Sequence, residues 1–519
     1  MVFPKVTHLK SANILPEKIC QFITINQPVL ELASYLSRLI NLEICGQDNI
    51  TPALGAALKA LRPSLINAEN KTINKNHTFT LRITGPSLFM THPIQYLLNK
   101  RFFDALNPHS VTSIDIDISD LWQWTLETIS EFMLSQARTL KSIRLRGVGD
   151  TEGVWQLLDK MRQRGCHLRG LDIEDRHVQQ PPATMPSAWA FRSDLFKKLK
   201  YLVVEGFHGI FFDYHMVDPT SFSTLLEHNL FGGRNGSTPS IKTLILTRTM
   251  SKSQVSEQID IFLMHLAPTL TTLELEYYDC GVLDDLAQGA QFREHGRYKL
   301  IEVLLKLSQL RRLKLVGYSA NIVLSSCIPP VTEGEELADE SPHLRSPSPS
   351  PHPHQSPLDQ HTIASGFQRS PAFNLFTTTW KSTLEELEII PWQLQASCVE
   401  VCLVDDTLLL FTLLEKLRTL IISFRKYDRF DRSGVDIDPM DGAGAEPPPT
   451  FGRLTSRGIL RFVNTLPNMT LLQEKMVMHS FSLSGDYVDD NTHLREAWPQ
   501  WAVEVAESME NRGGKFVLM

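Results

Sequence analysis

The chain has 519 residues, of which 42% are hydrophobic and 21% are charged, and its formal net charge is −7. This length exceeds that of an ordinary single-core domain, so we expect either several domains or a repeat protein that grows lengthwise. The acidic balance argues against a broad basic field, so we expect neither nucleic acid nor a membrane as a partner.

The seven cysteines are odd in number and mostly far apart, which is not typical of a disulfide framework. The first residues contain no apolar run of signal-peptide length. The best apolar stretch, near 399–411, is interrupted by Asp405 and Asp406. We therefore expect an intracellular protein, cytoplasmic or nuclear, that does not span a membrane.

Residues 1–38 have a mixed composition, with helical spacing of apolar side chains at 16–23 and 29–39. Pro16 suits the first turn of a helix. We predict that residues 1–38 form a helical cap over the open end of the repeats that follow, as stacked repeats require.

From residue 39 onward the pattern LxxLxL recurs along the chain. In each copy the last two apolar residues alternate, so both point to one side of a short strand. Segments with helical spacing, such as 154–161 and 255–266, connect the copies, and six of the ten steps between copies are 28–33 residues long. The copies begin at Leu39, Thr78, Val111, Leu140, Leu168, Leu199, Ile241, Leu270, Leu310, Leu384 and Leu417.

One strand and one helix cannot bury both of their apolar faces alone, so the copies should stack. Stacking forms a parallel sheet with helices along its outer side, joined by right-handed connections. The predicted fold is therefore α/β: a right-handed, horseshoe-shaped solenoid with a parallel sheet on the concave face and helices outside.

Two segments interrupt the repeats. Residues 329–378 are rich in Ser, Pro and His and contain six Ser-Pro pairs, and residues 425–452 include a Gly- and Pro-rich run. Neither can bury enough apolar surface to offset the entropy lost on ordering. The predicted division is a helical cap at 1–38, repeats at 39–328, a disordered insertion at 329–378, repeats at 379–424, a flexible loop at 425–452, and a degenerate repeat with a C-terminal cap at 453–519.

Over about residues 39–424 the pattern resembles that of leucine-rich-repeat proteins of the long, helix-bearing type. More narrowly, it is similar to irregular fungal repeat proteins, many of which are F-box proteins. Residues 15–19, Leu-Pro-Glu-Lys-Ile, look like the opening of an F-box, although the repeats begin too soon afterwards for its remaining helices. The resemblance implies a protein partner on the concave face and, for an F-box protein, a Skp-type adaptor of a ubiquitin ligase.

The exposed middle positions of successive copies alternate in charge. Opposite charges on neighbouring strands stabilise their pairing by ~0.2–1 kcal/mol per pair. The same alternation predicts that Lys314 lies beside Glu388, although 74 residues separate them. At the start of the repeats the series reads Arg82, Asp115, Arg144 and Asp172.

We predict that this exposed face binds the partner. Tyr201, Val203 and Ile245 form its apolar anchor, because aromatic and aliphatic centres carry most of the energy of an interface. The candidate partner-binding residues are Lys141, Arg144, Arg146, Tyr201, Val203, Glu205, Ile245, Glu274 and Glu276.

No arrangement of residues in the sequence indicates catalysis. The Gly-rich segment 147–153 lacks dinucleotide-binding spacing, Cys398 and Cys402 lack a second pair of metal ligands, and no nucleophile–base motif occurs. We expect a non-enzymatic interaction scaffold without cofactor or metal, with substrate recognition for a ubiquitin ligase as one form of that function. The alternative is a regulator of an enzyme, such as a GTPase activator or inhibitor, with Arg176 and Arg425 as candidate rim residues.

Overall fold

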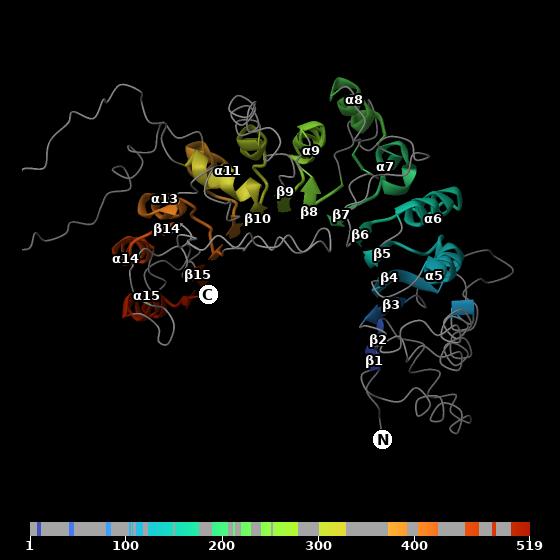
Figure 1. Cartoon of the computed structure of the whole chain (residues 1–519), viewed down its shortest axis with the longest axis horizontal. Coiled ribbons are helices and arrows are strands. Elements are labelled where there is room, and N and C mark those ends of the chain that lie inside the picture. Colours follow the sequence, from blue (N-terminus) through green and yellow to red (C-terminus); the bar gives the residue numbers. More distant parts are fainter. Residues whose placement is uncertain are drawn as a thin grey trace, which may run out of the picture. The chain divides into compact units, whose positions relative to one another are not determined.

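The computed structural model (Figure 1) divides the chain into two compact units, residues 1–270 and 271–519. It describes residues 8–11, 41–45, 79–84, 103–104, 106, 110–117, 123–148, 151–175, 189–205, 211–212, 219–229, 240–250, 253–278, 300–327, 372–391, 403–423, 452–466, 480–483 and 500–518.

In the first unit each strand pairs in parallel with the next strand along the chain. The helices lie along one face of these strands (Figure 1). The strands are β1 (His8–Ser11), β2 (Asn41–Cys45), β3 (Phe79–Thr84), β4 (Val111–Asp117), β5 (Ser142–Val148), β6 (Gly170–Asp175), β7 (Tyr201–Glu205) and β8 (Thr243–Met250). The helices are α5 (Gln123–Gln136), α6 (Thr151–Gln163), α7 (Trp189–Arg192), the 3-10 helix η3 (Asp194–Phe196), α8 (Pro219–Asn229) and α9 (Ser253–Leu266).

The second unit repeats this arrangement, and its described strands pair in parallel. Its strands, in order across the sheet, are β9 (Thr272–Tyr278), β10 (Arg312–Gly317), β11 (Glu386–Ile390), β13 (Thr419–Ile422), β15 (Ser480–Leu483) and β16 (Lys515–Leu518). The short strands β12 (Leu403–Val404) and β14 (Gly452–Arg453) pair separately. Its helices include α11 (Tyr318–Ser326), the π-helical turn η6 (Leu375–Thr379), α13 (Asp405–Phe411), α14 (Ser456–Thr465) and α15 (Gln500–Asn511).

The apolar positions of the repeated pattern form the core between strands and helices. In one copy Leu140, Ile143 and Leu145 are at most 2% exposed. The following helix, α6, buries the residues that its helical spacing places on one side: Val154, Leu157, Leu158 and Met161. Parallel strands, connecting helices and burial of the repeated leucines are therefore confirmed, and every predicted copy contains a strand.

A hydroxyl group just before the repeated pattern links neighbouring copies. The Thr139 hydroxyl donates to the carbonyl of Val111 at 2.9 Å, and that of Thr269 donates to the carbonyl of Ile241 at 3.1 Å. Ser240 makes the equivalent bond to Leu199. In each case the acceptor is the backbone carbonyl of the first residue of the preceding copy. The hydroxyl therefore satisfies a carbonyl group near the core and holds two neighbouring repeats together.

Three boundaries differ from the sequence-based prediction. The predicted helical cap contains strand β1, whose four residues carry too little apolar pattern to reveal it. Segment 15–19 and both expected cap helices, at 16–23 and 29–39, lie outside the described residues. The predicted disordered insertion ends too late, because Ala372, Leu375 and Phe376 are fully buried. Gly452, assigned to the flexible loop, begins β14.

The insertion leaves and rejoins the fold at one point. The backbone N–H of Ala372 donates to the carbonyl of Ser326 at 3.2 Å. The strands on either side, β10 and β11, are hydrogen-bonded neighbours in register. The segment between residues 327 and 372 is therefore not needed to bring the two strands together.

Candidate functional site

The face of the strands opposite the helices, called the open face below, carries side chains that alternate with the buried core positions. Strand β7 shows the pattern: Leu202 and Val204 are buried, whereas Tyr201, Val203 and Glu205 are partly exposed. Strand register places these residues in rows. One row of the first unit runs Arg82, Asp115, Arg144, Asp172, Val203 and Ile245.

Ion pairs join neighbouring strands along this row. Arg82 Nε lies 3.1 Å from Asp115 Oδ2, and Arg144 Nε lies 2.6 Å from Asp172 Oδ2. Arg146 adds a longer contact of 3.8 Å to Asp115 Oδ1. The predicted alternation of charge across adjacent strands is confirmed for strands β3 to β6.

Asp172 is the deeply placed member of the row, with only 5% of its surface exposed. Burial raises the pKa of its carboxyl to about 6, and the attraction of Arg144 and Arg146 only partly offsets that rise. The sequence pattern predicted an exposed residue here. The structure shows that the Arg144 side chain, paired with it, helps to remove it from solvent.

In the second unit Lys314 lies between two glutamates. Its Nζ is 3.1 Å from Glu274 Oε1 and 3.7 Å from Glu388 Oε1, and strand register places Lys314 directly beside both residues. Burial alone would lower the pKa of Lys314, but the surrounding carboxylates outweigh burial and raise it. Burial raises the pKa of Glu388, and Lys314 opposes that shift. The predicted contact across 74 residues is confirmed.

Glu276 was predicted to be exposed on this face, and that prediction is wrong. It is only 3% exposed. Helix α11 begins directly after β10, and its Ser319 hydroxyl donates to the carbonyl of Leu275 at 2.8 Å. The end of β9 is therefore packed against α11, and Glu276 is not available to a partner.

The predicted apolar anchor does come together. Val203 and Ile245 are register partners on β7 and β8, and Tyr201 precedes Val203 on the same face; all three are partly exposed. A Cβ built on Gly170 would lie 2.8 Å from Ser142 Oγ and 3.8 Å from Tyr201 Cδ1, so the Tyr201 ring lies against the neighbouring strand. Lys141, Arg144, Arg146 and Glu205 lie in the same unit, whereas Glu274 lies in the second unit.

A row of basic residues was missed by sequence reasoning. Lys141, Arg169, Lys200 and Lys242, called the basic row below, are exposed and occupy the second position of four consecutive copies. Backbone N–H groups connect them directly: Arg169 to the Lys141 carbonyl and Lys200 to the Arg169 carbonyl, each at 2.7 Å, and Lys242 to the Lys200 carbonyl at 2.9 Å. Aligning the second positions of the copies would have revealed this row.

Other predicted candidates lie outside the described residues, namely Arg176, Arg425, Cys398 and Cys402. Within the described part of the chain, no group of three or more His, Cys, Asp or Glu side chains is placed to hold a metal ion. No helix among the same residues has the length and apolar character needed to cross a membrane.

Comparison with known proteins adds no family to this description. No protein-family model matches the sequence, and no curated protein matches it significantly.

Proposed function

We propose that the chain is a right-handed, horseshoe-shaped leucine-rich-repeat solenoid that serves as a non-enzymatic interaction scaffold. Its open face is the proposed concave binding surface for a protein partner. The observation that carries this proposal is the partly exposed group of Tyr201, Val203 and Ile245 on adjacent strands, next to a row of ion pairs. Apolar and aromatic side chains held on rigid strands lose little entropy when a partner covers them.

The ion pairs support this proposal in a second way. Arg144 and Arg146 are held by carboxylates on neighbouring strands, so they present fixed hydrogen-bond donors beside the apolar group. Charged groups around an apolar centre favour one orientation of the partner and disfavour wrong partners. A protein surface with an apolar patch and flanking charges of both signs is the complementary ligand.

Substitution of the apolar group tests the proposal. The double variant Val203→Asp/Ile245→Asp should lose the proteins that cross-link to the wild-type chain in its native cell, because it places charge in the centre of the interface. Met264→Asp is the control, since Met264 is 48% exposed on helix α9. Equal recovery of the same proteins by all three chains would show that the open face is not the binding surface.

The role in a ubiquitin ligase is the narrower form of this proposal. It requires a Skp-type adaptor to co-purify with the chain, and that adaptor should be retained by the Val203→Asp/Ile245→Asp variant. A partner that is captured without any adaptor would leave a scaffold of another kind.

A further inference from the structure

The turns that lead into strands β5 to β8 form a basic surface on an acidic protein. Residues 137–141, 164–169, 193–200 and 240–242 contain eight Lys or Arg side chains and one carboxylate, Asp194, which gives a formal charge of +7. The whole chain has a net charge of −7. All eight basic side chains are exposed; they are Arg138, Lys141, Arg164, Arg169, Lys197, Lys198, Lys200 and Lys242, called the basic rim below.

Part of this charge has a structural explanation. Arg138 and Arg164 follow the C-terminal ends of α5 and α6, where a cation is favourable because of the helix dipole. Arg164 also donates to the carbonyl of Leu134 at 3.0 Å. Neither reason applies to the basic row, whose residues stand at the beginning of strands.

The basic row places like charges next to one another. Its members are linked by consecutive backbone hydrogen bonds, so they are about 4.8 Å apart and the row spans about 14 Å. Like charges directly opposite one another on neighbouring strands destabilise the sheet. Among the described residues, no carboxylate is within ion-pair distance of Lys141, Arg169 or Lys200.

In the second unit the second positions of the copies do not place like charges next to one another. There the backbone ladder runs through Thr271, Arg311, Glu385 and Arg418, so the charges alternate. Arg311 pairs with Glu385 at 3.8 Å, and in the adjoining turns Lys381 pairs with Glu415 at 3.3 Å. The same backbone framework therefore tolerates neutralising carboxylates, whereas in the described turns of the first unit no carboxylate pairs with Lys141, Arg169 or Lys200.

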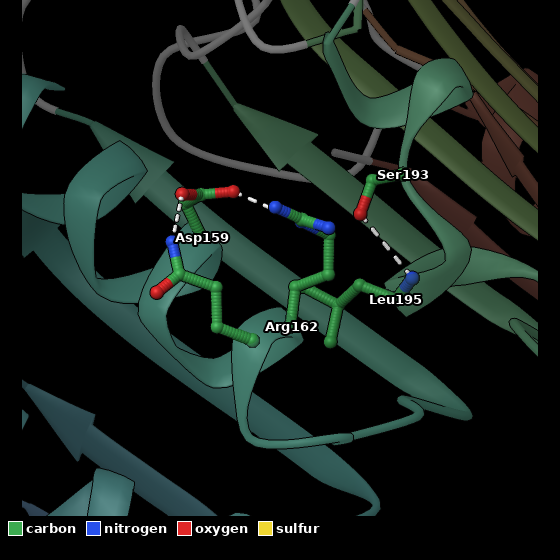
Figure 2. Close-up of polar contacts among 5 residues, drawn as sticks. Asp159, Arg162, Ser193 and Leu195 are labelled. Carbon is green, nitrogen blue, oxygen red and sulfur yellow. Dashed lines mark hydrogen bonds and ion pairs between the residues drawn. The ribbon is translucent and has the colours of Figure 1, made fainter.

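The turn that carries Lys197, Lys198 and Lys200 is held rigidly. Figure 2 shows Ser193 Oγ accepting a hydrogen bond from the Leu195 backbone N–H, at 3.2 Å, at the start of η3. Leu195, Phe196 and Leu199 are at most 1% exposed, so the turn is anchored in the core. The figure also shows Arg162 bound to Asp159 of its own helix, at 2.9 Å, which keeps that cation out of the rim.

We propose that the basic rim binds an acidic, extended peptide segment of a protein partner, rich in Glu and Asp, which crosses the ends of strands β5 to β8. Along an extended chain alternate residues point to the same side and are about 6.6 Å apart, so their flexible carboxylates can reach cations along the row. The occupant supplies the carboxylates that Glu385 and Glu415 supply within the second unit. This inference concerns a surface other than the apolar group of the open face and does not depend on it.

Nucleic acid fits this surface less well. The carboxylates of Asp172 and Glu205 lie on β6 and β7, and that of Asp115 lies on the neighbouring strand β4, which confines the positive field to one edge. Binding of single strands also uses exposed aromatic rings as stacking platforms. In the described turns of the basic rim Phe196 is buried. The exposed imidazole of His167 is the one other aromatic ring there.

The test measures binding of a fluorescein-labelled peptide of eight glutamates to the full chain by fluorescence anisotropy. The peptide should bind in 50 mM NaCl and dissociate progressively up to 300 mM NaCl. The variant Arg169→Glu/Lys198→Glu/Lys200→Glu should raise Kd about tenfold or more, because three favourable charge contacts are lost. If that variant does not fold by circular dichroism, the corresponding triple Gln variant replaces it, with a smaller rise expected.

The matched control makes the same change of charge in the second unit: Lys306→Glu/Lys416→Glu/Lys515→Glu, all at exposed positions. It should change Kd less than about twofold, because none of these three lysines belongs to the basic rim. Val203→Asp/Ile245→Asp should also retain the peptide, so failure of either proposal can be distinguished. Absence of peptide binding, an equal loss in the control, or tighter binding of an eight-nucleotide RNA or of phosphatidylserine vesicles would overturn the inference.

Discussion

Asp172 links the stability of the first unit to pH. Its carboxyl is buried, and its pKa of about 6 in the folded chain exceeds the ordinary value of 3.8. The folded state therefore holds this proton more tightly than the unfolded state does. The resulting stability is fully present below pH 3.8 and is lost as the pH rises through about 6.

The variant Asp172→Asn removes this titration. We expect its free energy of unfolding, relative to the wild type, to rise by about 1–3 kcal/mol between pH 4 and pH 7 and then to level off. Arg144 loses its partner, but its side chain is 43% exposed and can be hydrated. Urea unfolding at several pH values measures the difference.

Asp172→Glu is the control for this prediction, because it keeps a carboxyl at the same position and should keep the pH dependence. A difference between Asp172→Asn and wild type that stays constant from pH 4 to pH 7 would show that Asp172 is hydrated rather than buried.

Single residues also show what sequence reasoning could not reach. Gly458 in α14 has no distinctive neighbours in the sequence, yet a Cβ there would overlap the carboxylate of Asp405. That carboxylate accepts hydrogen bonds from the backbone N–H and the hydroxyl of Thr455, both at 2.7 Å, and Thr455 caps the helix. The contact joins residues 50 positions apart, and no repeat period indicates it.

At the level of elements, Lys314 holds three strands together. It sits on β10 and contacts Glu274 on β9 and Glu388 on β11. We expect Lys314→Met to lower the free energy of unfolding by about 1–2 kcal/mol at pH 7.5, because partly buried glutamates lose their counter-charge. The deficit should shrink at pH 5, since burial raises the pKa of Glu388 and its protonation relieves the repulsion. Chemical unfolding at the two pH values measures it.

Lys381→Met is the comparison variant. Lys381 pairs with Glu415 at 3.3 Å, but both side chains are about half exposed. Its substitution should cost less than about 0.5 kcal/mol at either pH. If the two variants lost the same stability, the position of Lys314 between strands would have no special importance.

The strands could be predicted because their apolar residues repeat with a fixed pattern and adjacent copies must bury the same face. The order of β10 and β11 also followed, since Lys314 and Glu388 continue the alternation of charge. Strand β1 was missed because Ser11 stands where the last apolar residue of the pattern would be, and β15 was missed although Met478, Phe481 and Leu483 have the spacing of the pattern. The burial of Glu276 depends on where α11 turns back over β9, which the pattern of β9 does not encode.

The candidate site was predictable only in part. Alternation within each copy placed Tyr201, Val203 and Ile245 correctly on one face. The residues of the basic row could be read from the sequence. Their significance depends on a comparison: cations are clustered at these positions in the first unit, whereas charges of opposite sign are paired at the equivalent positions of the second unit. This comparison requires the strand register, which shows which charged residues are neighbours.

For the whole molecule, the insertion between β10 and β11 should be dispensable for folding. Replacing residues 329–370 by a six-residue Gly/Ser linker should leave the free energy of unfolding unchanged or raise it by up to about 2 kcal/mol, because a shorter loop costs less entropy to close. The hydrogen bond between Ala372 and Ser326 marks the point where the ends already meet. Urea unfolding of the full chain with and without the segment measures the effect.

A chain with residues 329–370 in shuffled order is the control, because it keeps length and composition. A loss of more than about 2 kcal/mol on replacement, with no loss on shuffling, would mean that bulk in this segment supports the fold. A loss in both would mean that its particular sequence does.

The backbone ladder beneath the basic row has one more consequence. Each N–H and carbonyl in it belongs to the main chain, so the pitch between neighbouring side chains does not depend on what those side chains are. Descendants of this protein could exchange a lysine for a glutamate at any rung without moving the others. The main chain fixes the spacing of the charged positions, and the charge at each position can evolve separately to suit a different partner.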